Sequence, residues 1–353
     1  MSGLSKIAAE LAHYRKVSSA LRKASEGSHI RVPDDRLVEI EGFGANPGNL
    51  RMFVHVPEHL PPRPELVVVL HGCTQTAQAY DCGSGWSALA DDHGFILLYP
   101  EQKSANNGNT CFSWFDPALA SRDKGEAVSI RNMIERLAVD FDVDRDRVFV
   151  TGLSAGGAMA NVMLAAYPEV FAAGAVIAGL PFGGARNVHE AFRSMFSGAS
   201  KSCAEWGELV RQASNHRGPW PKISVWHGVG DSTVVPSNAQ EIIKQWTDLH
   251  ALPIHATSQQ TAGVHHQREW RDELGELRIE EHLIAGMDHG APLAKGLGAP
   301  GPYMFDVGVP STLEIARFFG LIGGRALAEP APTLLTSVEK TIAGTLRKAG
   351  ILR

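Results

Sequence analysis

Short apolar runs alternate with longer amphipathic segments along most of this chain. The apolar runs predict strands at residues 51–56, 66–70, 95–99, 148–150, 175–178, 223–226 and 277–284. Apolar residues at helical spacing predict helices at residues 86–93, 126–141, 238–249 and 312–319. Strands that alternate with helices are typical of a mostly parallel sheet covered on both faces, so the predicted fold class is α/β.

Several regions depart from this alternation. Apolar residues at helical spacing predict an N-terminal amphipathic helix within residues 1–30. A Pro/Ala-rich linker and a second amphipathic helix are predicted at 324–353, which leaves 31–323 as the α/β domain. Residues 183–220 hold no clear strand and predict a helical insertion over the sheet. The two terminal helices either pack against the domain or dock on a partner.

The composition is that of an ordinary soluble globular protein. Of the 353 residues, 44% are hydrophobic and 20% are charged, and the net charge is −5. This charge offers no electrostatic basis for binding nucleic acid. No segment approaches the roughly 18 apolar residues of a transmembrane helix. Charges scattered through residues 1–26 predict no secretory signal peptide, so the cytoplasm is one expected location. The oligomeric state is not predicted.

The segment 147–167 carries the most specific signal. An apolar, strand-like run ends at Gly-Leu-Ser-Ala-Gly, residues 152–156, and an Ala/Met/Leu-rich helical segment follows. A strand, a tight turn and a helix in this order form a nucleophile elbow, which holds a serine hydroxyl exposed on a strained turn. Gly152 and Gly156 leave room for the chain to turn back on itself. We therefore predict that Ser154 is a catalytic nucleophile.

A serine nucleophile needs a base, and the base needs an acid that orients it. In hydrolases with this elbow, the acid and then the histidine follow the serine, each in a loop after a strand. The predicted strand 223–226 leads into a glycine-rich loop with Asp231, and the strand 277–284 leads into a similar loop with His289. We predict that Asp231 orients His289, which acts as the base for Ser154.

Other histidines compete for the role of base, because the chain contains 15 of them. His71 and His227 stand before glycine at strand ends, where a histidine more often braces a loop. His265 and His266 precede a charged stretch and are predicted to be exposed to solvent. Only His289 combines a strand end, flanking glycine and the correct order along the chain.

The acid has one rival and one alternative role. Asp288 is the direct neighbour of His289 and can hardly reach round to its ring. A turn-capping role is the structural alternative for Asp231.

The tetrahedral intermediate of acyl transfer also needs backbone N–H donors for its oxyanion. One predicted donor is the amide of Ala155, which follows the nucleophile. The other is predicted in the loop after strand 66–70, where the amide of Cys73 is the best candidate. Plain turn chemistry is the alternative for that loop.

Five motifs occur in order along the chain. They are His-Gly-Cys-Thr-Gln at 71–75, Cys-Phe-Ser-Trp-Phe at 111–115, Gly-Leu-Ser-Ala-Gly at 152–156, Trp-His-Gly at 226–228 with Asp231, and Gly-Met-Asp-His-Gly at 286–290. Together they resemble the polyhydroxybutyrate depolymerase family of esterases, which also includes feruloyl and acetylxylan esterases. The resemblance implies an α/β-hydrolase fold and ester hydrolysis without a cofactor or metal. It also implies Ser154, Asp231 and His289 as a catalytic triad.

The resemblance further implies that Cys73 and Cys111 form a disulfide. Thr74, Gln75 and Trp114 lie in the matching motifs and are expected to contact the substrate. Packing in the core is the alternative for Trp114. No partner is predicted for the two other cysteines. An extracellular location follows from the resemblance, although no signal peptide is visible.

We therefore expect a serine esterase that acts on polyester or oligomers of the poly(3-hydroxybutyrate) type. A feruloyl, acetylxylan or other short-chain ester is the alternative substrate. No separate polymer-binding domain is visible, which favours soluble oligomers or small esters over crystalline polymer. A peptidase on the same fold and a non-catalytic binding module are the competing classes. The sequence shows no large lid domain that would select peptides.

Overall fold

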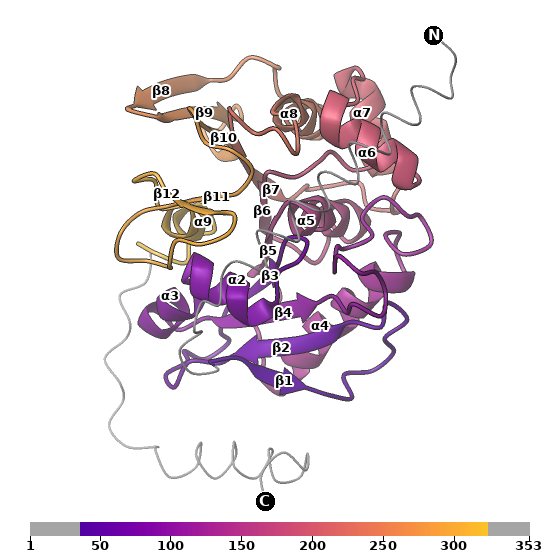
Figure 1. Cartoon of the computed structure of the whole chain (residues 1–353), viewed down its shortest axis with the longest axis vertical. Coiled ribbons are helices and arrows are strands. Elements are labelled where there is room, and N and C mark those ends of the chain that lie inside the picture. The colour runs from indigo at the N-terminus through magenta and orange to yellow at the C-terminus, as the bar shows by residue number, and fades with distance from the viewer. Residues whose placement is uncertain (1–35, 324–353) are drawn as a thin grey trace, which may run out of the picture.

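The computed structural model describes residues 36–323 of the chain (Figure 1). The helices predicted within 1–30 and 324–353 lie outside the described residues, and the domain boundaries stay predictions. Across 36–323, no helix is both long enough and apolar enough to cross a membrane.

A ten-stranded sheet forms the centre of the molecule. In spatial order its strands are β1 (Val38–Ile40), β2 (Arg51–His55), β4 (Ile96–Glu101), β3 (Leu66–Leu70), β5 (Val148–Leu153), β6 (Ala173–Ile177), β7 (Lys222–Gly228), β10 (Leu277–Ile284), β9 (His265–Arg271) and β8 (Ser258–Ala262). The strands from β4 to β10 in this order run parallel. The strands at both edges of the sheet are antiparallel to their neighbours.

Helices cover both faces of the sheet (Figure 1). On one face lie α4 (Gly125–Asp140), α5 (Ala155–Ala166), α6 (Val188–Ser197), α7 (Cys203–Arg211) and α8 (Ser237–Leu249). On the other lie α2 (Ala77–Ser84), α3 (Trp86–His93) and α9 (Ser311–Phe318), with the small parallel pair β11 (Ala291–Leu293) and β12 (Met304–Asp306). This arrangement is the α/β-hydrolase fold, as predicted.

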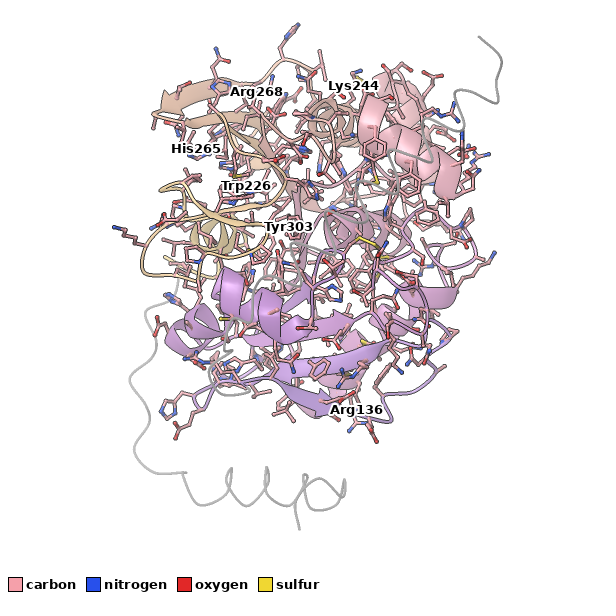
Figure 2. The ribbon with its side chains drawn as sticks, viewed as in Figure 1. Arg136, Trp226, Lys244, His265, Arg268 and Tyr303 are labelled. Carbon is pink, nitrogen blue, oxygen red and sulfur yellow. A yellow bond between two sulfur atoms is a disulfide. The ribbon has the colours of Figure 1, made fainter. Side chains whose placement is uncertain are left out.

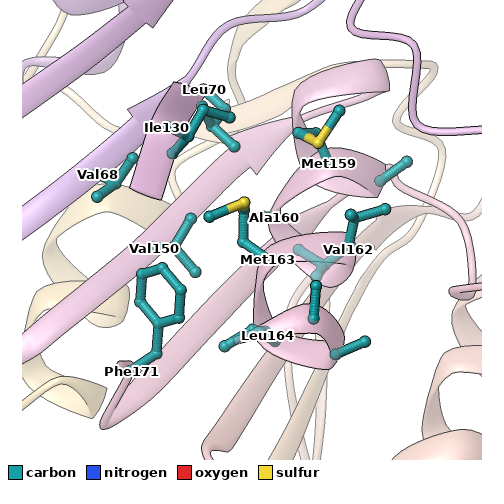
Figure 3. Close-up of a cluster of buried hydrophobic side chains, with 14 of the residues drawn as sticks. Val68, Leu70, Ile130, Val150, Met159, Ala160, Val162, Met163, Leu164 and Phe171 are labelled. Atoms are coloured by element: carbon teal, nitrogen blue, oxygen red, sulfur yellow. The ribbon is translucent and has the colours of Figure 1, made fainter. Parts of the chain in front are cut away.

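The helix α5 is enclosed in the core, and its twelve residues are all buried. Figure 3 shows this region, with Met159 and Met163 of α5 in the same apolar cluster as Val68 and Val150 of the sheet. A helix that is apolar on every side has to be enclosed, because any exposed face would leave apolar surface in water. The burial of α5 fixes the position of its N-terminus, which follows directly after Ser154.

The main elements predicted from the hydrophobic pattern are confirmed, with boundaries that shift by a few residues. The insertion 183–220 folds into α6 and α7 and contains no strand. The hairpin of β8 and β9 was not predicted. The sequence of β8 is Ser-Gln-Gln-Thr-Ala and all five residues are exposed, so the strand has no apolar face that a pattern could reveal.

One expectation about the histidines is wrong. His265 and His266 lie within β9 and are half-buried, whereas both were predicted to be exposed. The imidazole of His265 packs in a stack with His282 and Trp226, with ring centroids 5.0 and 5.8 Å away. Figure 2 labels His265 and Trp226 of this stack. The antiparallel pairing of β9 with β10 and the parallel pairing of β10 with β7 bring these residues together, and only the folded sheet reveals those pairings.

Candidate active site

Ser154 occupies the sharp turn between β5 and α5. Its backbone has φ 58° and ψ −118°, a conformation that residues other than glycine rarely adopt. Such a residue costs about 1–3 kcal/mol and persists only where its surroundings enforce it. One constraint is the hydrogen bond that the Ser154 amide donates to the carbonyl of Ile177 on β6, at 2.8 Å. The turn therefore has the strain expected of a nucleophile elbow.

The two glycines of the elbow are required by close backbone contacts. A Cβ atom on Gly156 would lie 2.3 Å from the carbonyl oxygen of Leu70 and 2.4 Å from that of His71. A Cβ atom on Gly152 would lie 2.4 Å from the carbonyl oxygen of Gly156. A larger residue at position 156 would push α5 away from the loop after β3, and one at position 152 would push α5 away from β5. The glycines thus bring the Ser154 turn and that loop into contact.

Hydrogen bonds join Ser154, His289 and Asp231 in a continuous chain. Nε2 of His289 lies 2.8 Å from Oγ of Ser154, and Nδ1 of the same ring lies 2.7 Å from Oδ2 of Asp231. The three side chains come from positions up to 135 residues apart. The structure therefore brings together the three residues predicted to form the triad.

Asp231 is a buried carboxylate with donors on both oxygens. Oδ1 accepts hydrogen bonds from the amides of Thr233 and Val234, at 2.9 and 2.8 Å. Oδ2 faces His289 and also Nε2 of His227, which is 3.2 Å away. Burial alone would raise the pKa of Asp231, but the hydrogen bonds from His227 and His289 outweigh burial and hold the pKa well below its usual range. The carboxylate is therefore ionised at neutral pH.

The loops that carry Asp231 and His289 pack directly against each other. A Cβ atom on Gly228 would lie 2.3 Å from the carbonyl oxygen of Met287. Asp288, the rival candidate for the acid, does not orient the imidazole but links these two loops by hydrogen bonds. Its Oδ1 accepts hydrogen bonds from the amides of Ser232 and His289, at 3.2 and 2.8 Å.

The loop after β3 is fixed by hydrogen bonds on both sides of Cys73. The amide of Gly72 donates to Oε1 of Gln75 at 2.8 Å, and the amide of Thr74 donates to the carbonyl of Asn109 at 2.7 Å. Among residues 36–323, neither the Cys73 amide nor the Ala155 amide has a hydrogen-bond acceptor. The two amides predicted to form the oxyanion hole are therefore uncommitted within the described structure.

The buried side chain of His71 braces this loop, as predicted for a histidine that stands before glycine at a strand end. Its Nδ1–H donates to the carbonyl of Gly72 at 2.7 Å, and its Nε2 accepts from the amide of Gln102 at 3.1 Å. Burial lowers the pKa of His71 to about 4, so the ring is neutral at pH 7 and keeps this bonding pattern.

A disulfide joins Cys73 to Cys111, which confirms the predicted pairing. It ties the loop after β3 to the segment that contains Trp114. Cys82 and Cys203 are free thiols and half-buried.

The three residues expected to contact the substrate lie near this loop, but their side chains are engaged in the fold. Gln75 accepts the Gly72 amide as described, and the hydroxyl of Thr74 donates to the carbonyl of Cys73 at 2.6 Å. Trp114 is 8% exposed and packs edge-on against Phe115. Core packing, the alternative for Trp114, describes its environment, and its contact with substrate stays a prediction.

Tyr303 lies beside the site, although it belongs to none of the five sequence motifs. Its ring contacts the ring of His289, and the two centroids are 6.0 Å apart. It lies 14 positions after His289 in a glycine- and proline-rich loop, where no periodic pattern points to the site. No group of three or more His, Cys, Asp or Glu side chains within 36–323 is arranged to hold a metal ion.

Residues 54–272 match the family model described as esterase PHB depolymerase. The chain belongs to this family. It is 46% identical over 293 residues to poly(3-hydroxyalkanoate) depolymerase C of Paucimonas lemoignei, covering 81% of this chain and 70% of that protein. It is also 32% identical over 287 residues to probable acetylxylan esterase A of Aspergillus fumigatus, covering 78% of this chain and 75% of that protein.

Two further comparisons agree with the family assignment. Feruloyl esterase B of Neurospora crassa is 34% identical over 264 residues, with 72% of this chain and 88% of that protein covered. The solved acetyl xylan esterase from Aspergillus awamori superposes with a TM-score of 0.70 at 25% identity, covering 81% of this chain and all of that one. The chain is thus a carboxylic ester hydrolase of the serine hydrolase class.

Proposed function

We propose that this chain hydrolyses polyesters or oligoesters of 3-hydroxyalkanoic acids with Ser154, His289 and Asp231 as a catalytic triad. The observation that carries the catalytic assignment is the hydrogen-bonded chain of these three side chains at a strained elbow. The substrate assignment is supported by the 46% identity to a poly(3-hydroxyalkanoate) depolymerase, which exceeds the 32% and 34% identities to the acetylxylan and feruloyl esterases.

In the acylation step, Oγ of Ser154 attacks the ester carbonyl carbon while Nε2 of His289 takes the hydroxyl proton. The carbonyl oxygen becomes an oxyanion, which the amides of Cys73 and Ala155 stabilise by donating hydrogen bonds. The tetrahedral intermediate then collapses. The bond to the alcohol oxygen breaks, His289 returns the proton to that oxygen, and the acyl group stays on Ser154 as an ester.

In the deacylation step, water replaces the alcohol. His289 takes a proton from the water molecule as its oxygen attacks the acyl carbon. Collapse of the second tetrahedral intermediate releases the acid and returns the proton to Oγ of Ser154. Asp231 keeps its negative charge throughout and stabilises the protonated imidazole, while the hydrogen bond to Nδ1 holds the ring in the orientation that both steps need.

The direct test compares five substrates with the wild-type enzyme and with Ser154→Ala. The substrates are p-nitrophenyl butyrate, 3-hydroxybutyrate oligomers, amorphous poly(3-hydroxybutyrate) suspension, methyl ferulate and acetylated xylan. We expect the wild-type enzyme to cleave the oligomers and to release soluble hydroxybutyrate products from the polymer suspension. For the Ser154→Ala variant we expect a loss of about 10⁴–10⁶-fold in kcat. A folded Ser154→Ala variant with a tenth of the wild-type activity would contradict the assignment of the nucleophile.

The second candidate is an acetylxylan or feruloyl esterase with the same triad. It is favoured by the superposition on the acetyl xylan esterase from A. awamori, which covers that whole chain. Fast cleavage of acetylated xylan or methyl ferulate, with no release of soluble products from the polyester, would favour this second candidate.

We also propose that the enzyme works in an oxidising, extracellular environment. The Cys73–Cys111 disulfide supports this location, because reducing compartments keep most cysteines as thiols.

A further inference from the structure

We infer that His227 is a positioning residue of the active site, a second imidazole that holds the carboxylate of Asp231 in line with His289. This inference rests on the proposed triad. His227 precedes the acid loop at the end of β7 and has no solvent exposure. Loop bracing is the simpler role for a histidine at this position, and it accounts for only one of the two contacts that its Nε2 makes.

The hydrogen bonds of His227 locate its proton. Nε2 lies 2.8 Å from the carbonyl oxygen of Val234, and a carbonyl oxygen can only accept. Nε2 therefore carries a hydrogen. The same nitrogen lies 3.2 Å from Oδ2 of Asp231, so its N–H is shared between the two acceptors. The Val234 contact closes the loop 227–234, whereas the Asp231 contact reaches the triad itself.

With His227 included, the carboxylate of Asp231 is saturated. An ionised carboxylate has about four lone-pair sites, and four N–H donors surround this one. Two are backbone amides on Oδ1, and two are imidazole nitrogens on Oδ2, those of His289 at 2.7 Å and His227 at 3.2 Å. The carboxylate cannot turn about its Cβ–Cγ bond without breaking bonds on both oxygens. Its side chain is fully buried, so water cannot replace a lost donor.

For catalysis, the contact affects the direction in which Oδ2 of Asp231 meets the N–H at Nδ1 of His289. The torsion that rotates a carboxylate has a broad energy profile, so its orientation depends on its partners. His227 contacts Oδ2 while the two amides bind Oδ1, so donors on both oxygens fix the plane in which Oδ2 meets Nδ1 of His289. Without this donor, Oδ2 would have His289 as its only partner, and the amides on Oδ1 alone would hold the carboxylate plane against movement of the ring. The imidazole would then spend less time aligned with Ser154.

The surroundings of His227 allow matched variants. Gln places an amide N–H about where Nε2 of His lies, whereas Leu keeps an apolar side chain of similar reach without a donor. The control is His250, a half-buried histidine whose Nε2 donates a hydrogen bond to the carbonyl of Pro221 at 3.0 Å, with no carboxylate bonded to the ring among the described residues. His250→Leu therefore removes a comparable N–H to carbonyl bond at a position outside the active site.

The experiment measures kcat and KM for p-nitrophenyl butyrate per active serine, counted by titration with a reactive phosphonate ester. For His227→Leu we expect kcat to fall about 10- to 100-fold with KM changed less than about threefold, short of the about 10⁴-fold effect of losing a triad acid. His227→Gln should recover to within about threefold of wild type. His250→Leu should lose stability and keep its kcat per active serine.

Two results would overturn the inference: a kcat for His227→Leu within about twofold of wild type, or equal losses in the Gln and Leu variants. If His227→Leu does not fold, NMR of the wild-type imidazole decides, read as scalar coupling across the hydrogen bonds of Nε2. Coupling from Nε2 of His227 to the carboxyl carbon of Asp231 supports the inference, and coupling to the carbonyl carbon of Val234 alone refutes it. An active Ser154→Ala variant would instead refute the proposed triad, so the two failures are distinguishable.

Discussion

The ring of Tyr303 meets the imidazole of His289 edge-on, with ring centroids 6.0 Å apart and planes inclined by 74°. Its backbone has φ 63°, which is unfavourable for a bulky aromatic residue. The backbone amide of Ala291 donates to the Tyr303 carbonyl at 2.8 Å, and a Cβ atom on Gly290 would lie 2.5 Å from that same oxygen. The chain after His289 is thus shaped to hold this aromatic ring against the proposed base.

We predict that Tyr303→Ala lowers kcat/KM for a short-chain p-nitrophenyl ester about two- to tenfold. An edge-to-face aromatic contact contributes about 0.5–1.5 kcal/mol, and its loss leaves the His289 ring less well held. Tyr303→Phe keeps the contact and should stay within about twofold of wild type. Equal losses in the two variants would show that the hydroxyl group matters and not the ring.

We predict that Gly156→Ala damages both folding and turnover. The added methyl group would lie 2.3 Å from the carbonyl oxygen of Leu70, so α5 must move away from the loop after β3. The Ala155 and Cys73 amides, which are the proposed oxyanion donors, would then be displaced relative to each other, and loss of one oxyanion donor costs about 10²–10³-fold in kcat. Gly108→Ala is the control, because a Cβ atom there has no neighbour within 4 Å. A Gly156→Ala variant with wild-type kcat would exclude this account of the elbow.

We predict that Cys111→Ser lowers both stability and kcat. The disulfide closes a loop with a sequence separation of 38, for which chain entropy gives about 4 kcal/mol of stabilisation. Its loss also frees Cys73, whose amide is a proposed oxyanion donor. Denaturant unfolding and steady-state kinetics measure the two effects. Replacing the free thiols Cys82 or Cys203 by serine is the control, and equal effects in those variants would contradict the prediction.

We predict that the protein loses stability as the pH falls from about 6.5 toward 4. Burial lowers the pKa values of His71 and His250 to about 4 in the folded protein, below the ordinary value of 6.5 that applies after unfolding. Between these values the unfolded chain binds protons that the folded protein does not. Linkage then removes about 2 kcal/mol per histidine between pH 7.5 and pH 5.

The variant His250→Gln tests this prediction, because its amide can still reach the carbonyl of Pro221 and does not titrate. The free energy of unfolding, measured in urea at pH 7.5 and pH 5, should vary by about 2 kcal/mol less in this variant than in wild type. An unchanged pH dependence would mean that His250 takes up its proton in the folded state.

Much of the candidate site could be predicted because its signals are local. The elbow around Ser154 is a turn whose glycines and flanking apolar runs are consecutive in the sequence. Asp231 and His289 each follow a strand that is apolar enough to be recognised, and the carboxyl ends of parallel strands meet at one edge of the sheet. Strand periodicity and glycine placement were therefore sufficient to select the three residues that the fold brings together.

The sequence by itself determined the α/β architecture and the choice of Ser154, Asp231 and His289 as the candidate triad, because these depend on periodicity and turn chemistry within short segments. The tertiary structure alone decided that His227 lies on the carboxylate of Asp231 and that Tyr303 lies against His289. It also decided that a polar hairpin extends the sheet beyond β10. Those relationships depend on register between strands and on contacts between loops, which no local pattern encodes.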